Sequence, residues 1–361
     1  MNGLVSQSQS VVIPIEIRVQ VGAPRAAEAP AQALLTAVAP PKPAAKVLVR
    51  ASEGVKLDTN YGNRNGFDDE FVSDVRVDLA KIAKPRKSSI APLHDGEAHG
   101  ANGELRYQNF SVIMHKGRRF ALLTATNIDG PTYVSIDRKT GEPADPQPEG
   151  ETWYRDSRIS DSYFVDQAFY SSWSHLFDRG HLTRRDDPTW GEFATRANKD
   201  TFHFTNCTPQ HWKFNESIKF WQGIERYVLE RGLFASGRDK QLTVLQGPIL
   251  DDANDLWAED VQIPSTFWKV VVWKGAGGLK AVAMMADQTK LFSMQRSGGA
   301  PPPPPETPVS VTEYRASIAT IENKTGLDLS VLRPYDTAAQ DLPVVGEALS
   351  IITKWDDIRL S

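Results

Sequence analysis

The sequence has 361 residues, 40% of them hydrophobic, which is enough to bury a sizeable core in one large domain or two smaller ones. Its formal net charge of -4 argues against a protein that coats nucleic acid through a broad basic surface, but it leaves room for a local cationic groove. The single cysteine, Cys207, excludes an intramolecular disulfide and a zinc site built from several thiolates.

Membrane and secretion signals are missing from the sequence as given. No apolar run has the length of a membrane span, and residues 1–10 lack the basic and apolar regions of a secretory signal. We therefore expect a cytoplasmic protein with no membrane contact, and non-classical export is the open alternative.

The N-terminal part divides by composition. Residues 11–21 (VVIPIEIRVQV) alternate apolar and polar side chains, which predicts a strand, and residues 22–46 are dominated by Ala and Pro, which predicts a linker. Residues 47–104 carry turn-rich and basic stretches without a clear pattern. We therefore predict an N-terminal strand plus linker at 1–46, an extension or regulatory segment at 47–104, and the main domain at 105–361.

Strand patterns dominate the main domain. Runs rich in β-formers predict strands over residues 110–114, 119–126, 242–250, 267–273 and 279–286, with a turn at His115-Lys116-Gly117 between the first two. Five prolines at 301–305 predict a loop. The capping-box pattern that begins at Ser310, with apolar residues at helical spacing up to Ile321, predicts a helix that ends at Gly326. These elements indicate one antiparallel or mixed sheet with helices packed on it.

The stretch at 177–182 (FDRGHL) is the first candidate site. It places a carboxylate, a guanidinium and an imidazole within four residues, and buried polar groups need partners that an ordinary core does not supply. A lone histidine is more often structural, but His181 has neighbours that suit a base acting on water beside a phosphodiester. Asp178 can orient the imidazole, and Arg179 can bind a phosphate oxygen through its fork of donors.

A second candidate lies at the segment that follows. Asn215 precedes residues 216–231, where an asparagine is usually only a helix N-cap. Glu225 falls on the buried side of this predicted helix, and a hydrated metal ion is one way to satisfy such a carboxylate. One amide ligand with a carboxylate on the bound waters suits Mg²⁺. The apolar residues that define the buried side are Ile218, Trp221, Ile224 and Val228.

Several nearby residues carry less specific signals. We expect His175, His203 and His211 to be structural or surface histidines, and Cys207 to be a small buried side chain. His211 is close enough to the motifs in sequence that an outer contact to the site is the open alternative.

Taken together and in this order, the motifs resemble the DNA/RNA non-specific endonuclease family, the ββα-metal, endonuclease G-like nucleases. The resemblance runs from about Leu105 to about Asp336. The motifs that carry it are Asp178-Arg179-Gly180-His181, Asp200-Thr201-Phe202, Thr205-Asn206-Cys207-Thr208-Pro209-Gln210, Phe214-Asn215 and Trp221-Gln222-Gly223-Ile224-Glu225.

The resemblance implies an α+β fold, with a central antiparallel sheet flanked by helices and a ββα-metal unit that carries the site. It also implies Mg²⁺-dependent, sequence-non-specific cleavage of DNA and RNA to 5′-phosphate ends, with Mn²⁺ as a substitute cofactor. By this resemblance His181 would be the general base, Asn215 the metal ligand and Arg179 the phosphate contact. Glu225 would be a catalytic carboxylate that binds metal-bound water. Asp178 and Asn206 would support the site.

The sequence departs from the family pattern beside Glu225. One helical turn later the best-known members place an arginine, where this chain has Leu229. Arg226 and Arg231 are the candidates to replace it, and we add Arg226 and Arg184 to the predicted substrate contacts. The acidic residues that follow Arg184 can pair with it instead.

Two further hypotheses concern the protein as a whole. One is a catalytically silent nucleic-acid-binding protein on a nuclease fold, which the intact residues at 178–181 and 215 disfavour. The other is a regulated enzyme, such as a bacterial defence or toxin effector, because a non-specific nuclease without an export signal endangers its own cell. We therefore hypothesise that residues before about Leu105 bind a regulatory protein or shield the groove. A homodimer is compatible with either hypothesis.

Overall fold

The computed structural model describes residues 55–97, 102–136, 152–215, 241–275, 277–293, 312–339, 349–353 and 355–358. The chain divides into two units, Met1–Ala33 and Leu34–Ser361, and all the described residues belong to the second. The predictions for residues 11–21, 22–46, 216–231 and 301–305 fall outside the described residues.

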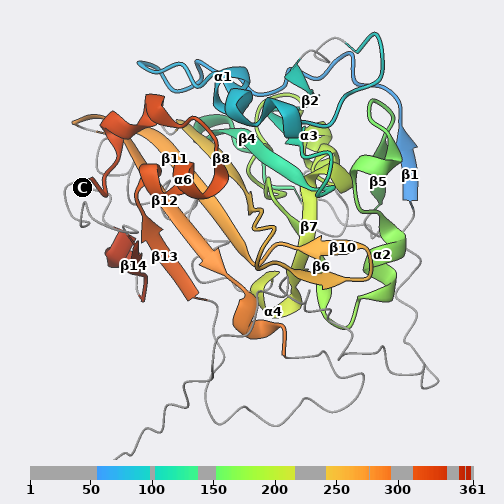
Figure 1. Ribbon diagram of the computed structural model, residues 1–361. Helices are drawn as coiled ribbons and strands as arrows, with labels where there is room; N and C mark the ends of the chain where they lie inside the picture. The colour runs from blue at the N-terminus through green and yellow to red at the C-terminus, as the bar shows by residue number, and fades with distance from the viewer. Residues whose placement is uncertain are drawn as a thin grey trace, which may run out of the picture. The chain divides into compact units, whose positions relative to one another are not determined.

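Eight of the described strands form one antiparallel sheet, in the order β14-β13-β12-β11-β8-β4-β3-β2 (Figure 1). All residues of β3 and β4 are buried, so both faces of the sheet are covered at these strands. The strands are β2 (Glu104–Tyr107), β3 (Phe110–Met114), β4 (Ala121–Asp129), β8 (Gln241–Ile249), β11 (Thr266–Gly275), β12 (Gly278–Asp287), β13 (Thr312–Ala316) and β14 (Leu349–Ile351).

This sheet confirms the predicted α+β fold with a central antiparallel sheet. The five predicted strands correspond to β3, β4, β8, β11 and β12, and the predicted turn at His115 joins β3 to β4. Among the described residues, the remaining strands pair two by two. They are β1 (Val55–Asp58) with β5 (Trp153–Asp156), β6 (Phe177–His181) with β7 (Cys207–His211), and β9 (Leu256–Ala258) with β10 (Val261–Ile263).

The two faces of the sheet bury different partners, because successive strand residues point to opposite sides. Trp268 of β11 belongs to the cluster that contains Ile82 of α1 (Leu79–Ala83) and Ile321 of α6 (Ile318–Thr325). Phe267, its neighbour on the same strand, belongs to the cluster that contains Phe177 of β6. The helices α1 and α6 therefore cover one face, and the segment with the candidate site covers the other.

One predicted element is wrong in its first half. The expected helix begins at Ser310, but residues 312–316 form β13, whose Tyr314 pairs with Met285 of β12. The ladder hydrogen bonds of β12 favour the strand over the weak helical spacing of these residues. The helix α6 begins after Ser317, whose side chain accepts from the Thr320 N–H, and it ends at Gly326 with φ 69°, as predicted.

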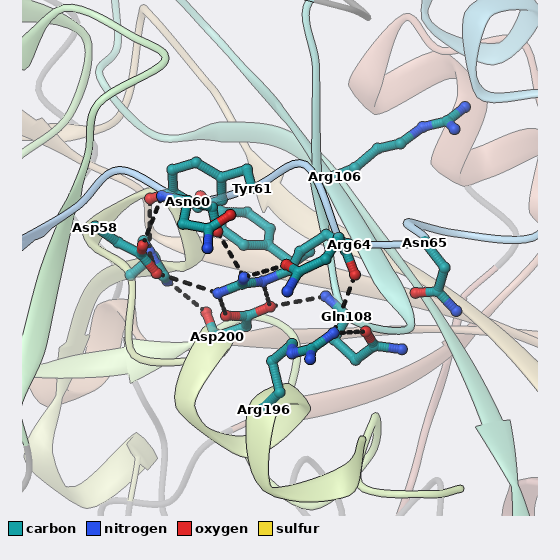
Figure 2. A network of polar contacts seen from close by, with 12 residues as sticks. Asp58, Asn60, Tyr61, Arg64, Asn65, Arg106, Gln108, Arg196 and Asp200 are labelled. Carbon is teal, nitrogen blue, oxygen red and sulfur yellow. Dashed lines mark hydrogen bonds and ion pairs between the residues drawn. The ribbon is translucent and has the colours of Figure 1, made fainter. Parts of the chain in front are cut away.

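The segment that follows β1 contacts Asp200 through a network of polar side chains (Figure 2). The strand β1 pairs in parallel with β5. Beyond it, the Arg64 guanidinium binds both carboxylate oxygens of Asp200 at 2.9 Å and one oxygen of Asp58 at 3.2 Å. The Arg64 side chain is 6% exposed and that of Asp200 is 0% exposed. Asp200 is the last residue of α3 (Ala194–Asp200), so this ion pair fixes the end of that helix to the N-terminal segment.

We predict that Arg64→Ala lowers the free energy of unfolding by about 3–5 kcal/mol, because it leaves the Asp200 carboxylate buried without its main partner. Chemical denaturation of the purified protein measures the change. Arg76→Ala is the matched control: Arg76 is 65% exposed and pairs with Asp69 at the surface, so its removal should leave the free energy of unfolding nearly unchanged. Equal effects of the two substitutions would contradict the prediction.

Candidate active site

The candidate site is built on the hairpin of β6 and β7. The register places Asp178 opposite Gln210 and His181 opposite Cys207. Because side chains alternate along a strand, Arg179 and His181 share one face of β6 and Asp178 lies on the other. The helix α4 (Trp212–Asn215) follows β7 directly, so the three elements form the ββα unit that the resemblance implies.

Asn215 lies within α4 rather than at its start. The helix begins at Trp212, so the interpretation of Asn215 as an N-cap is wrong. The Lys213 N–H donates instead to Nδ1 of His211, at 3.1 Å, which satisfies one of the donors at the beginning of the helix. The Asn215 Nδ2 donates to Oδ2 of Asp178 at 3.2 Å, so the structure brings together these two predicted site residues from α4 and β6.

Arg179 and His181 both contact the indole of Trp153 in β5. The Arg179 guanidinium carbon is 4.8 Å from the centre of the indole, and Nη1 donates to Oε1 of Gln167 in α2 (Gln167–Ser172). The imidazole of His181 is 5.0 Å from the indole and meets Phe202 edge to face at 5.0 Å. The base and the phosphate contact predicted from the sequence therefore lie on the same aromatic side chain.

Gly180 allows close packing inside the hairpin. A β-carbon at this position would lie 2.2 Å from Cδ and 2.3 Å from Cγ of Gln210. The Gln210 side chain therefore occupies the space that a side chain at position 180 would take.

Asn206 joins the chain after His181 to the segment before β7. Its Oδ1 accepts from the Thr183 N–H at 3.0 Å, and its Nδ2 donates to the carbonyl oxygens of Thr183 at 2.9 Å and Thr201 at 3.0 Å. Asn206 is fully buried, and these bonds fix the position at which β6 ends.

The structure describes some of the arginines predicted to contact substrate and not others. Arg184 forms an ion pair with Asp187 at 3.5 Å, which is the alternative that the acidic neighbours suggested. The next residue along the chain, Arg185, donates to Oδ1 of Asn198 at 2.5 Å and lies over the ring of Phe202 at 5.6 Å. Glu225 and Arg226 fall outside the described residues.

The donor atoms at the hairpin suit a hard divalent cation. Asn215 and Asp178 offer amide and carboxylate oxygens, which Mg²⁺ and Mn²⁺ prefer. Burial raises the pKa of the Cys207 thiol to about 12, so the sulfur is protonated at neutral pH and does not serve as a thiolate ligand. Within the described residues, no three His, Cys, Asp or Glu side chains cluster as a metal site of their own.

His203 is a structural histidine, as expected. It is fully buried, with Nδ1 at 2.8 Å from the carbonyl oxygen of Asp200 and Nε2 at 2.9 Å from the hydroxyl of Tyr61. Because a carbonyl oxygen only accepts, Nδ1 carries the hydrogen and Nε2 accepts from Tyr61, which satisfies a neutral ring. Burial lowers the pKa of His203 despite the three carboxylates around it.

Sequence reasoning missed Trp153 and Gln167 as neighbours of Arg179. Trp153 belongs to a stretch that precedes the central motif, but neither its spacing nor its residue type distinguishes it from a core tryptophan. The pairing of β5 with β1 and its contact with the 3₁₀ helix Phe204–Asn206 bring it to the site, and these contacts leave no local signal in the sequence.

Comparison with known proteins places the chain beside other nucleases. The family model for DNA/RNA non-specific endonucleases matches residues 95–334. An uncharacterized protein of Sinorhizobium fredii (strain NBRC 101917 / NGR234), y4fB, is 34% identical over 224 residues, 58% of this chain and 30% of that protein. The mitochondrial nuclease EXOG of Xenopus laevis is 26% identical over 119 residues, 30% of this chain and 31% of that protein. This chain therefore aligns with less than a third of the length of either relative.

A solved structure of the EndoG/EndoGI complex, which concerns the mechanism of EndoG inhibition, also matches. It aligns with a TM-score of 0.42 and 18% identity and covers 64% of this chain and 86% of that chain. In the part of the chain that the structure describes, no helix combines the length and apolarity needed to cross a bilayer.

We predict that the buried neutral His203 makes the protein less stable in acid. Its pKa is lower when folded than the ordinary value of 6.5, so below that pH the unfolded chain binds a proton that the folded chain does not. The free energy of unfolding should fall between pH 7 and 5, by up to about 1.4 kcal/mol per pH unit for this group.

Denaturant titrations of wild type and His203→Gln at several pH values measure this dependence, which the substitution should flatten. His94→Gln is the control, because His94 lies on the surface. An unchanged slope in His203→Gln would show that His203 does not contribute to the acid sensitivity.

Proposed function

We propose, since the chain belongs to the DNA/RNA non-specific endonuclease family, that it is a metal-dependent endonuclease that hydrolyses phosphodiester bonds in DNA and RNA to 5′-phosphate ends. The observation that carries the proposal is the β6-β7-α4 unit inside the matched residues. It places the Asp178–Asn215 contact and the Arg179–His181 pair on one hairpin.

His181 is proposed as the general base. An ordinary imidazole titrates near neutral pH, so it takes a proton from water and makes the attacking oxygen nucleophilic. Arg179 lies two residues away on the same face of β6, and its guanidinium offers several donors to a non-bridging phosphate oxygen. The proposed base and the proposed phosphate contact are therefore side chains two residues apart on one face of the same strand.

Asn215 is proposed as the direct ligand of Mg²⁺ or Mn²⁺ through Oδ1, with Glu225 binding metal-bound water. When bound, such an ion stabilises the negative charge that develops on the phosphate and the leaving oxygen. Asp178 accepts from Nδ2 of Asn215, which orients the amide. Asn206 supports the same unit through its bonds to Thr183 and Thr201.

The N-terminal residues are proposed to regulate the enzyme, as in a defence effector, by binding a protein partner or shielding the groove. Full-length protein and protein that lacks residues 1–46 should then differ in nuclease activity or in oligomeric state. Equal activity together with an unchanged oligomeric state would remove this part of the proposal.

We predict that wild-type protein converts circular DNA and structured RNA to short fragments in Mg²⁺ or Mn²⁺, and that EDTA stops the reaction. His181→Ala and Asn215→Ala should each lower the rate by at least about 100-fold, the range for loss of a positioned base or a metal ligand. Gel assays of initial rates measure this, and ligation of the DNA fragments without added kinase tests for 5′-phosphate ends.

Arg76→Ala, a substitution of an exposed residue away from the hairpin, should keep the wild-type rate. If wild type cleaves neither substrate with either metal, the proposed activity is wrong for the isolated protein. Binding of nucleic acid without cleavage would instead support the catalytically silent alternative.

A further inference from the structure

Trp153 contacts two residues of the proposed site at once. Its indole lies 4.8 Å from the guanidinium carbon of Arg179 and 5.0 Å from the ring of His181. These two side chains share a face of β6 and start about 7 Å apart along the strand, so one indole can span both. The contact with Arg179 is a cation–π interaction, and the contact with His181 is a tilted aromatic pair at 48°.

Other aromatic side chains hold the indole of Trp153 in place. Trp153 is 1% exposed, and it packs against Phe202 edge to face at 5.5 Å and against Phe204 at 5.6 Å. Its strand, β5, pairs with β1, and the Tyr154 N–H next to it donates to the carbonyl oxygen of Phe202 at 2.9 Å. Because backbone and ring are both constrained, the indole cannot follow a movement of Arg179 or His181.

A tryptophan is a costly choice for this position. Its Nε1–H is buried, and among the described residues it has no hydrogen-bond partner. A phenylalanine would fill most of the space without an unpaired donor, so core stability alone favours phenylalanine. The larger indole provides in full what phenylalanine provides only in part, a ring wide enough and electron-rich enough to meet both a guanidinium and an imidazole.

We propose that Trp153 is a positioning residue that sets the distance and orientation between the imidazole of His181 and the guanidinium of Arg179. The catalytic part of this inference rests on the proposed function. Gln167 binds the Arg179 guanidinium as a second contact, and Phe202 bounds the His181 ring at its edge. Trp153 contacts both groups and therefore couples them.

The test compares Trp153→Leu, Trp153→Phe and Trp273→Leu in the full-length protein. Trp273 is the matched control, because it is also fully buried but belongs to a separate cluster on β11. Initial rates on circular DNA in Mg²⁺ give kcat and KM. Trp153→Leu should lower kcat at least tenfold, with KM changed less than threefold. Trp153→Phe should recover kcat to within about fivefold of wild type.

Trp273→Leu should lower the melting temperature at least as much as Trp153→Leu and keep kcat within twofold of wild type. That contrast separates positioning from loss of stability. If kcat of Trp153→Leu stays within twofold of that of Trp273→Leu, the proposal is overturned.

A second readout does not depend on activity. The ring protons of His181 lie against the indole, so proton NMR should show a ring-current shift that disappears in Trp153→Leu and persists in Trp273→Leu. His181→Ala identifies the resonance. If wild type proves inert as a nuclease, the NMR result still decides whether Trp153 orients His181, and unchanged His181 resonances in Trp153→Leu would refute it.

Discussion

The antiparallel pairing of β6 with β7 is the interaction on which the candidate site depends. It aligns Asp178 with Gln210 and His181 with Cys207, so two motifs that are separate in sequence form one hairpin. The helix α4 then starts without a loop, and Asn215 reaches Asp178. A slip of one residue would turn His181 to the opposite face of the hairpin. Tight packing of Gln210 beside the glycine at position 180 opposes such a slip.

A buried ion pair holds the end of β5, the strand that carries Trp153. Arg158 binds Asp156 at 2.7 Å, with side chains 7% and 0% exposed, and its guanidinium lies 3.6 Å from the centre of the Tyr61 ring. Burial alone would raise the pKa of Asp156, but the hydrogen bonds and charge of Arg158 outweigh burial and lower it. A buried pair is stabilising only when its geometry is nearly complete, so these contacts tolerate little displacement of β5. The rigidity of the Trp153 strand follows from them.

The sequence predicted the fold class because the strands contain runs of β-forming residues that indicate a strand whatever the details of packing, as in β3 and β11. It failed at residues 312–316, where the pairing partner β12 decides between strand and helix and is distant in sequence. Asp178 and Asn215 were predicted from a local motif and are in contact in the structure. The contacts of Trp153 with Arg179 and His181 could not be predicted, since they depend on how β5 meets β6 across the fold.

The structural unit around the site extends beyond the residues that the family model matches. That match begins at residue 95, but Arg64 binds Asp200 and Tyr61 binds His203 on the segment that leads into β7. A chain cut at residue 95 would bury the Asp200 carboxylate without its guanidinium and would leave β5 without the pairing of β1. Loss of activity in such a chain would therefore report damage to the structure around Asp200 and Phe202, and it would say nothing about regulation. For that reason a test of regulation has to remove residues before 55 and keep the Arg64 contact in place.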